Sequence, residues 1–183
     1  MSEDADLRLL LEALRLKDLP RAGWLRAGAP APESVAAHSW GVGLLVLTLA
    51  PPELDRGRAL AFALLHDLAE VRVGDITPHD GVPPAEKRAR ERTAAEALLA
   101  AHPALLALWE AYEAQACPES RFVRQLDRVD MALQAQIYAA RGQIDPAPFL
   151  RSAARALTDP RLRALAGAAD QPGGHPSGRP PST

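Results

Sequence analysis

One stretch of the sequence restricts the fold more than any other: LLHDLAEVRVGDITP, residues 64–78, where ionisable residues interrupt an apolar run. Its apolar residues recur at i, i+3 and i+4, the spacing of one helix face, and this places His66 and Glu70 one turn apart. Buried ionisable groups cost several kcal/mol unless they are paired or bound to a metal. We therefore expect a helix that carries a compensated polar site. The residues expected to face the core are Leu64, Leu65, Leu68, Val71 and Val73.

The remainder of the chain also indicates helices. A length of 183 residues corresponds to about one domain, and the sequence is rich in Ala and Leu, with no segment of alternating strand pattern. We predict an all-α fold, a helical bundle of about six to eight helices, with an irregular Pro- and Gly-rich segment at residues 19–33. The domain is expected to span residues 1–169, and the Pro- and Gly-rich tail at 170–183 is expected to be disordered. The predicted helices are residues 6–17, 34–49, 54–73, 84–102, 103–115, 120–140, 147–157 and 161–168.

Charge and composition narrow the possible partners. With 21 basic and 23 acidic residues, the formal net charge is -2, so no overall field attracts nucleic acid or an anionic membrane. The single cysteine, Cys117, cannot form a disulfide within the chain, which suits a reducing compartment. The first residues do not resemble a secretory signal, and the longest apolar stretch, 42–50, is too short to span a bilayer. We expect a cytoplasmic protein without nucleic-acid or membrane partners.

Further candidate metal ligands occur on other predicted helices. The His66-Asp67 pair offers an imidazole nitrogen and a carboxylate oxygen, a donor set suited to Mn, Fe, Co, Ni or Zn. His38 lies on the helix at 34–49, although a lone helical histidine is more often a packing or surface residue. Asp127 lies on an apolar face of the helix at 120–140, whereas Asp130 is predicted to form a surface ion pair with nearby arginines. Two imidazoles and two carboxylates would leave room for water in an octahedral shell.

The irregular segment at 19–33 contains Trp24 with Arg21 and Arg26 beside it. An indole ring can stack on a base, and a guanidinium group fits phosphate oxygens, so the segment could bind a nucleotide. The alternative is that Trp24 fills the edge of the core and the arginines are solvated. The local pattern favours this second interpretation and leaves the first open.

Taken in order, the segments ESVAAH at 33–38, HDLAE at 66–70, GDITP at 74–78 and FVRQLD at 122–127 form a distinctive combination. With them, the chain resembles the HD-domain phosphohydrolase superfamily, and more closely its 5′-deoxynucleotidases. The resemblance implies an HD-domain bundle, a homodimer, and hydrolysis of deoxynucleoside 5′-monophosphates to deoxynucleoside and phosphate. The primary metal ligands that it implies are His38, His66, Asp67 and Asp127.

The resemblance also implies roles around that metal. Glu70 and Asp75 would transfer protons and orient water, or would hold a second divalent ion together with the backbone carbonyl of Ile76. Trp24 matches a substrate-pocket aromatic, and Arg21 is a candidate phosphate clamp. The cofactor is expected to be a divalent ion, one of Mn, Co, Mg, Fe, Ni or Zn. Such an ion would acidify a bound water, which then attacks phosphorus in line with the ester oxygen.

Two kinds of alternative remain open. The same residues could serve another phosphohydrolase, acting on cyclic nucleotides, on a broader set of monophosphates or on deoxynucleoside triphosphates. The chain could instead be a non-catalytic helical binding module in which the metal is a structural staple. Glu70 and Asp75 favour an enzyme, because a structural metal site does not require them.

Overall fold

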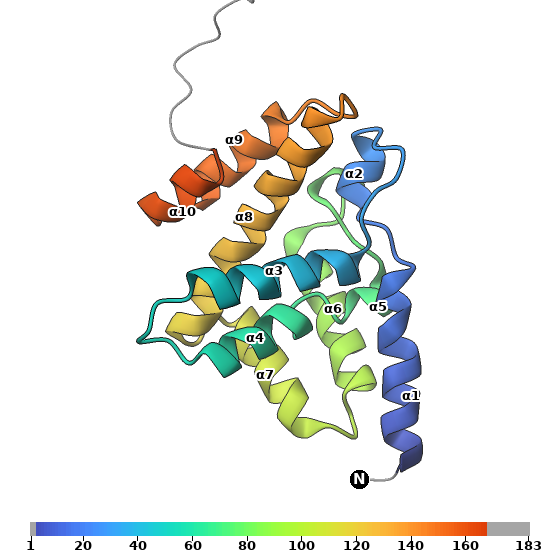
Figure 1. Cartoon of the computed structure of the whole chain (residues 1–183). Coiled ribbons are helices and arrows are strands. Elements are labelled where there is room, and N and C mark those ends of the chain that lie inside the picture. Colours follow the sequence, from blue (N-terminus) through green and yellow to red (C-terminus); the bar gives the residue numbers. More distant parts are fainter. Residues whose placement is uncertain (1–2, 168–183) are drawn as a thin grey trace, which may run out of the picture.

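Helices form the regular structure of the computed structural model, which describes residues 3–167 (Figure 1). The all-α prediction is confirmed: within these residues no strand is present, and one isolated β-bridge pairs Pro20 with Ser34. The expected tail at 170–183 lies outside the described residues. The elements in chain order are α1 (Glu3–Ala13), the 3-10 helix η1 (Leu14–Lys17), α2 (Ala22–Arg26), α3 (Val35–Leu49), α4 (Arg56–Leu65), α5 (Glu70–Val73), the 3-10 helix η2 (Pro78–Asp80), α6 (Pro84–Leu98), α7 (Pro103–Glu113), α8 (Pro118–Ala140), α9 (Ala147–Ala156) and α10 (Pro160–Leu165).

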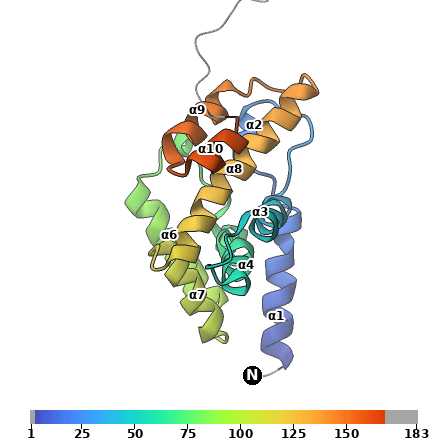
Figure 2. The same ribbon diagram turned by 60° about the vertical axis from the view of Figure 1, so that its left-hand side comes forward.

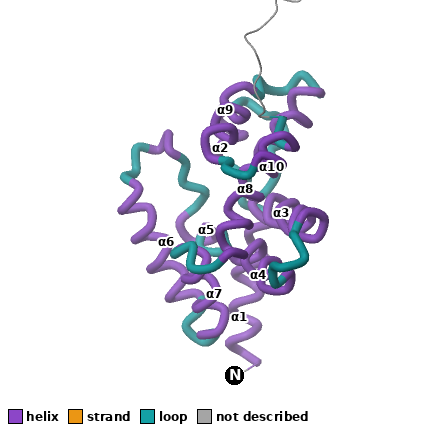
Figure 3. Tube along the Cα trace, turned by 90° about the vertical axis from the view of Figure 1, so that its left-hand side faces the viewer, coloured by secondary structure: helices purple, strands orange, loops and turns teal. Residues whose placement is uncertain are grey.

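The long helix α8 is central, and α3, α4, α7, α9 and α10 all pack against it (Figures 1 and 2). The main core lies where α3, α4 and α8 meet, and Val42, Phe62 and Leu126 have no exposed surface there. A second apolar cluster joins η1, α3, α6 and α7 around Val35 and Leu99. Figure 3 shows that α9 and α10 lie towards the opposite end of the molecule from α1. Side chains from distant parts of the sequence therefore meet at the centre.

Local sequence signals set where several helices begin. The Ser34 hydroxyl accepts a hydrogen bond from the backbone N–H of Ala37 at 3.1 Å, so Ser34 is the N-cap of α3 as predicted. Asp55 caps α4 in the same way through the N–H of Arg58. Proline occupies the first position of α6, α7, α8 and α10, where its missing N–H leaves no hydrogen bond unmade.

The helix predicted at 54–73 is interrupted between α4 and α5. Through residues 66–69 the backbone makes tighter bonds, for example from the N–H of Leu68 to the carbonyl of Leu65 at 3.0 Å. The prediction that Leu64 faces the core is wrong, because that side chain is 61% exposed. The buried face of α4 passes instead through Ala59, Phe62 and Ala63. Apolar spacing alone did not distinguish these two faces.

The segment predicted to be irregular, residues 19–33, contains the short helix α2. Together with the division of the helix at 54–73, α2 accounts for the helices beyond the predicted six to eight. No helix within residues 3–167 has both the length and the apolar character needed to cross a membrane.

Candidate functional site

Three separate parts of the fold bring the four predicted metal ligands together. His38 comes from α3, His66 and Asp67 from the turn between α4 and α5, and Asp127 from α8. The Nε2 atom of His38 lies 3.3 Å from Nε2 of His66 and 3.4 Å from Oδ1 of Asp127. Oδ2 of Asp67 lies 3.1 Å from Nε2 of His66. His38, His66 and Asp67 thus offer ligand atoms that all lie within 4.8 Å of one another, and Asp127 approaches this group through His38.

Hydrogen bonds behind both histidines direct Nε2 toward this group. Nδ1 of His66 lies 2.9 Å from the carbonyl oxygen of Ala63, and because a carbonyl can only accept, Nδ1 is the donor. Nδ1 of His38 lies 2.7 Å from Oδ2 of Asp130, and a carboxylate is likewise an acceptor. With Nδ1 engaged in this way, the lone pair of each neutral imidazole is on Nε2.

The prediction that Asp130 forms a surface ion pair is wrong. Its side chain is only 15% exposed and points to His38 on α3. One sequence signal could have indicated this position: Asp130 follows Asp127 by three residues, so both lie on the same side of α8. Only Asp127 was predicted to face inward, because its neighbours on the helix are apolar.

Neighbouring charges shift the pKa values of both carboxyl groups in the cluster. Burial raises the pKa of the Asp67 carboxyl, but His66 and Arg21 outweigh burial and hold that pKa well below its ordinary value. Burial also raises the pKa of Asp127, whereas the hydrogen bond from His38 lowers it to a net position well below its ordinary value. Both carboxyl groups are therefore ionised, as metal ligands must be.

The pKa of His38 is shifted in the opposite direction, upwards. Burial lowers the pKa of His38, but hydrogen bonds to Asp127 and Asp130 raise it to about 9. A proton on His38 and a cation in the cluster would satisfy the same carboxylates. The donor set, two imidazoles with two ionised carboxylates, fits a divalent transition ion.

Glu70 lies buried beside the ligands, with 4% of its surface exposed. Burial, together with the charges of Asp67 and Asp75, raises the pKa of Glu70 well above its ordinary value. Its Oε2 atom has no hydrogen-bond partner among the described residues. A buried carboxyl oxygen of this kind calls for a proton, a cation or a substrate group to compensate it.

The segment after α5 is fixed to two other elements. Oδ2 of Asp75 accepts a hydrogen bond from the N–H of Ala22 in α2 at 2.7 Å. The carbonyl oxygen of Ile76 accepts one from Nζ of Lys87 in α6 at 2.9 Å, and Lys87 also pairs with Glu91 at 3.3 Å. Two of the groups expected to hold a second ion therefore have protein partners in this structure. The sequence alone indicates no site role for Lys87.

Arg21 and Trp24 occupy different environments. Nη1 of Arg21 donates to Oδ2 of Asp67 at 3.2 Å, so this guanidinium lies directly at the cluster. Trp24 is only 1% exposed, and its ring lies against Phe149 and Tyr138, with centroids 4.4 and 5.3 Å away. Its Nε1 donates to Oε1 of Glu33 at 2.8 Å. Trp24 thus packs in the core, next to the helix start that presents Arg21.

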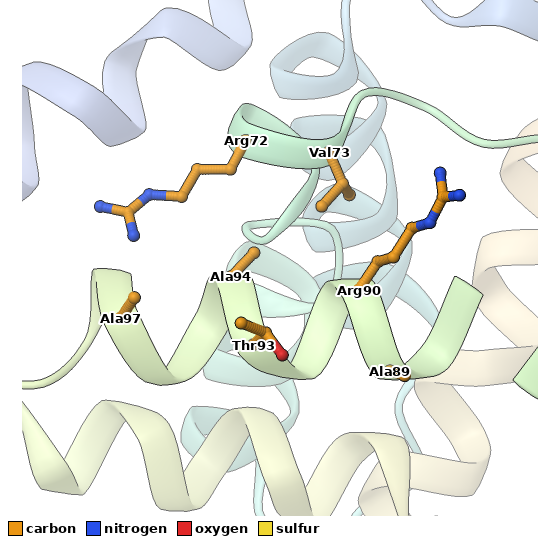
Figure 4. Close-up of a pocket in the computed structure, with 7 residues that line it drawn as sticks. All are labelled: Arg72, Val73, Ala89, Arg90, Thr93, Ala94 and Ala97. Carbon is orange, nitrogen blue, oxygen red and sulfur yellow. The ribbon is translucent and has the colours of Figure 1, made fainter. Parts of the chain in front are cut away.

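A separate groove lies between α5 and α6 (Figure 4). Its two arginines extend away from each other, and Arg72 is engaged by Glu12, whose Oε1 lies 2.6 Å from Nε of Arg72. No predicted site residue lines this groove, so the candidate site is the ligand cluster. The residues that line the groove are Arg72, Val73, Ala89, Arg90, Thr93, Ala94 and Ala97.

Comparison with known proteins agrees with this geometry. The model of a family described as HD domain matches residues 13–159. The chain is 39% identical to human 5′-deoxynucleotidase HDDC2, over 72% of this chain and 69% of that protein. It is 34% identical to 5′-deoxynucleotidase YGK1 of Saccharomyces cerevisiae, over 74% and 68% of the two chains.

Solved structures give the same fold. The PH0347 protein of Pyrococcus horikoshii OT3 superposes with a TM-score of 0.75 and is 30% identical, over 88% of this chain and 99% of that chain. A predicted metal-dependent phosphohydrolase from Magnetospirillum magnetotacticum MS-1 superposes with a TM-score of 0.69 and is 28% identical, over 90% and 91%.

Proposed function

The chain belongs to the HD domain family, and from that premise we propose that it is a metal-dependent phosphomonoesterase acting on deoxynucleoside 5′-monophosphates. The products are the deoxynucleoside and inorganic phosphate. Relatives that are 34 to 41% identical to the chain and carry the name 5′-deoxynucleotidase support this substrate class. The observation that carries the proposal is the close group of His38, His66 and Asp67, with Asp127 within 3.4 Å of His38 and the buried acid Glu70 beside them.

The residues proposed to hold the divalent ion are His38, His66, Asp67 and Asp127. Their mixed nitrogen and oxygen donors suit Mn, Co, Fe, Ni or Zn, and Mg is a further candidate. When bound, such an ion supplies an acidified water and neutralises charge on the phosphoryl oxygens.

Glu70 is proposed to manage the proton of the reaction. Its carboxyl group is buried next to the ligand cluster, and burial raises its pKa well above its ordinary value, the direction of shift that suits a carboxyl group acting as a general acid or base. Oε2 is the atom available for the transfer, because the described residues leave it without a partner. Asp75 shares this role, and both carboxylates with Ile76 stay candidates for a second ion.

Arg21 is proposed to bind the substrate phosphate. Burial lowers its pKa, but the charges of Asp67 and Asp127 raise it further, so the guanidinium stays charged. A planar guanidinium matches two phosphate oxygens, and a phosphate could replace Asp67 as its partner. Trp24 supports this indirectly by packing the helix that follows Arg21. Its direct contact with a base stays a prediction.

A panel of substrates tests the proposal. We expect phosphate release from deoxynucleoside 5′-monophosphates by metal-stripped protein resupplied with Mn²⁺, Co²⁺ or Mg²⁺, and less release from the ribonucleotides. Cyclic nucleotides and deoxynucleoside triphosphates in the same panel test the other phosphohydrolase activities. Metal binding without hydrolysis of any member would favour the non-catalytic module, in which the ion is a structural staple.

We also propose that the chain works as a homodimer in the cytoplasm, without nucleic-acid or membrane partners. Large apolar side chains are exposed on α1, η1, α3 and α4. A two-fold dimer pairs identical patches, so an apolar surface suits a second copy. The residues are Leu7, Leu10, Leu11, Leu14, Trp40, Leu44, Leu47 and Leu64.

A further inference from the structure

Asp130 holds His38 from the side opposite the ligand cluster. The ring of His38 has no exposed surface, so its orientation depends on the groups that surround it. Oδ2 of Asp130 lies 2.7 Å from Nδ1, whereas Nε2 faces Asp127 at 3.4 Å. Asp127 and Asp130 lie one turn apart on α8, so a single helix contacts both nitrogens of one imidazole.

Gly41 leaves the space that this carboxylate occupies. It lies on α3, three residues after His38, and a Cβ built on it would overlap Oδ1 of Asp130 and come within 3.1 Å of its Cγ. Contacts that short do not occur, so any larger residue at position 41 would displace the carboxylate. Glycine inside a helix lowers stability relative to alanine. The close approach of the Asp130 carboxylate explains why position 41 is nevertheless a glycine.

Gly43 provides the contrast within the same helix. A Cβ built on Gly43 would meet only Cδ2 of Leu60, at 3.9 Å, an ordinary van der Waals distance. The two glycines therefore differ in what a methyl group would contact, although both lie inside α3. This difference makes Gly43 a matched control for Gly41.

We propose that Asp130 is a positioning residue for His38, and that Gly41 is required because it lets the Asp130 carboxylate lie against α3. The inference rests on the proposed function, because it takes His38 as a metal ligand. The hydrogen bond to Nδ1 fixes the ring and keeps the Nε2 lone pair directed at the cluster. Removing such a partner behind a ligating histidine typically weakens metal binding about 10- to 100-fold.

The test measures Co²⁺ binding to metal-stripped full-length protein by calorimetric titration. Asp130→Ala and Gly41→Ala are each expected to weaken Co²⁺ binding about 10- to 100-fold. Asp130→Asn, which keeps an acceptor for Nδ1, is expected to lose less than Asp130→Ala. Gly43→Ala is expected to bind Co²⁺ as the wild type does. The visible absorption spectrum of bound Co²⁺, which reports ligand geometry, should change in Asp130→Ala but not in Gly43→Ala.

A double variant tests whether Gly41 acts through the carboxylate. In the Asp130→Ala background there is no carboxylate for the new methyl group to displace, so Gly41→Ala should cause no further loss of affinity. If Gly41→Ala weakens Co²⁺ binding equally with and without the carboxylate, the role assigned to Gly41 is overturned. Equal Co²⁺ affinity in the wild type and Asp130→Ala, at unchanged melting temperature, overturns the role of Asp130.

Phosphate release measured on the same proteins separates this inference from the proposed function. A wild type that binds Co²⁺ without hydrolysing any nucleotide, with weaker binding in Asp130→Ala, would overturn the proposed function and support the positioning role. If the wild type is active and Asp130→Ala is equally active and binds Co²⁺ equally well, the proposed function is supported and the positioning role is overturned.

Discussion

At the scale of single residues, charged partners rather than burial distinguish the carboxyl groups proposed to hold the ion from the one proposed to move a proton. Asp67 and Asp127 keep their negative charge because histidine and arginine partners outweigh burial. Glu70 has no such partner on Oε2, and its pKa moves in the opposite direction. The carboxyl groups of one site therefore have pKa values shifted in opposite directions.

Substitution of these carboxylates should separate metal binding from turnover. Asp67→Ala is expected to abolish both, because it removes a ligand and the partner of Arg21. Glu70→Ala is expected to retain the primary ion but lose about 10²- to 10⁴-fold in kcat, the usual contribution of a general acid or base. Metal content by elemental analysis and phosphate release check both variants. Equal metal content in the wild type and Asp67→Ala would contradict the ligand assignment.

The burial of Trp24 leads to a second prediction at this scale. Trp24→Ala should lower the free energy of unfolding by about 3–5 kcal/mol, because it empties a space among aromatic rings and leaves Glu33 without its donor. Urea unfolding measures the loss. Leu25→Ala, next along α2 at a side chain that is 52% exposed, is the control and should change stability little. Equal stability of the two variants would be inconsistent with a packing role.

Residue types and their order were enough to propose four ligands through the family resemblance, because the combination of segments at 33–38, 66–70 and 122–127 is distinctive. They were not enough for Asp130, and for Trp24 they favoured core packing but left contact with a base open. A carboxylate that contacts a ligand from behind carries no spacing signal of its own. Whether an aromatic ring is buried depends on which distant side chains reach it, here Tyr138 and Phe149.

At the scale of elements, helix starts were predictable and the internal break was not. Ser34 and the prolines mark helix starts through local chemistry. The residue types at 66–69 continue the helical pattern, but several backbone hydrogen bonds there span three residues instead of four. Apolar periodicity does not reveal this change. The turn formed there lets adjacent residues His66 and Asp67 both reach the cluster. The helix-forming tendency of the α2 segment was hidden by the glycines and prolines around it.

The attachment of the segment after α5 to α6 gives a prediction about this element. Lys87→Met removes the ammonium group that holds the Ile76 carbonyl but keeps the aliphatic chain. We expect turnover to fall about tenfold or more, because small displacements of positioned groups are costly to catalysis. Arg88→Met, at an exposed position on the same helix, should behave as the wild type. Steady-state kinetics on both variants measures the effect, and unchanged kcat in Lys87→Met would contradict it.

At the scale of the whole molecule, the meeting of α3, α4 and α8 creates both the core and the site. No local pattern states which helices pack together, so the arrangement follows from the family resemblance and the structure. The helix α3 has one face in the core and one face at the molecular surface. One face buries Val42 and Val46, and the opposite face leaves Trp40, Leu44 and Leu47 exposed.

The exposed face of α3 predicts a change in oligomeric state. Leu47→Glu places a charge in the proposed dimer surface and should convert dimers to monomers, as measured by light scattering coupled to size-exclusion chromatography. Ile137→Glu is the control, since Ile137 is similarly exposed at 44% but lies on α8. A wild type that is monomeric at micromolar concentration, or dimers that persist in Leu47→Glu, would exclude this surface.

The four proposed ligands are distributed along most of the chain, from α3 to α8. A cut between α6 and α7 would leave His38, His66 and Asp67 on one fragment and Asp127 on the other. Neither fragment alone carries the complete donor set. A cleaved or truncated chain should therefore have no hydrolytic activity, rather than a reduced one. Restored hydrolysis after mixing two such fragments would report reassembly of the entire helical core.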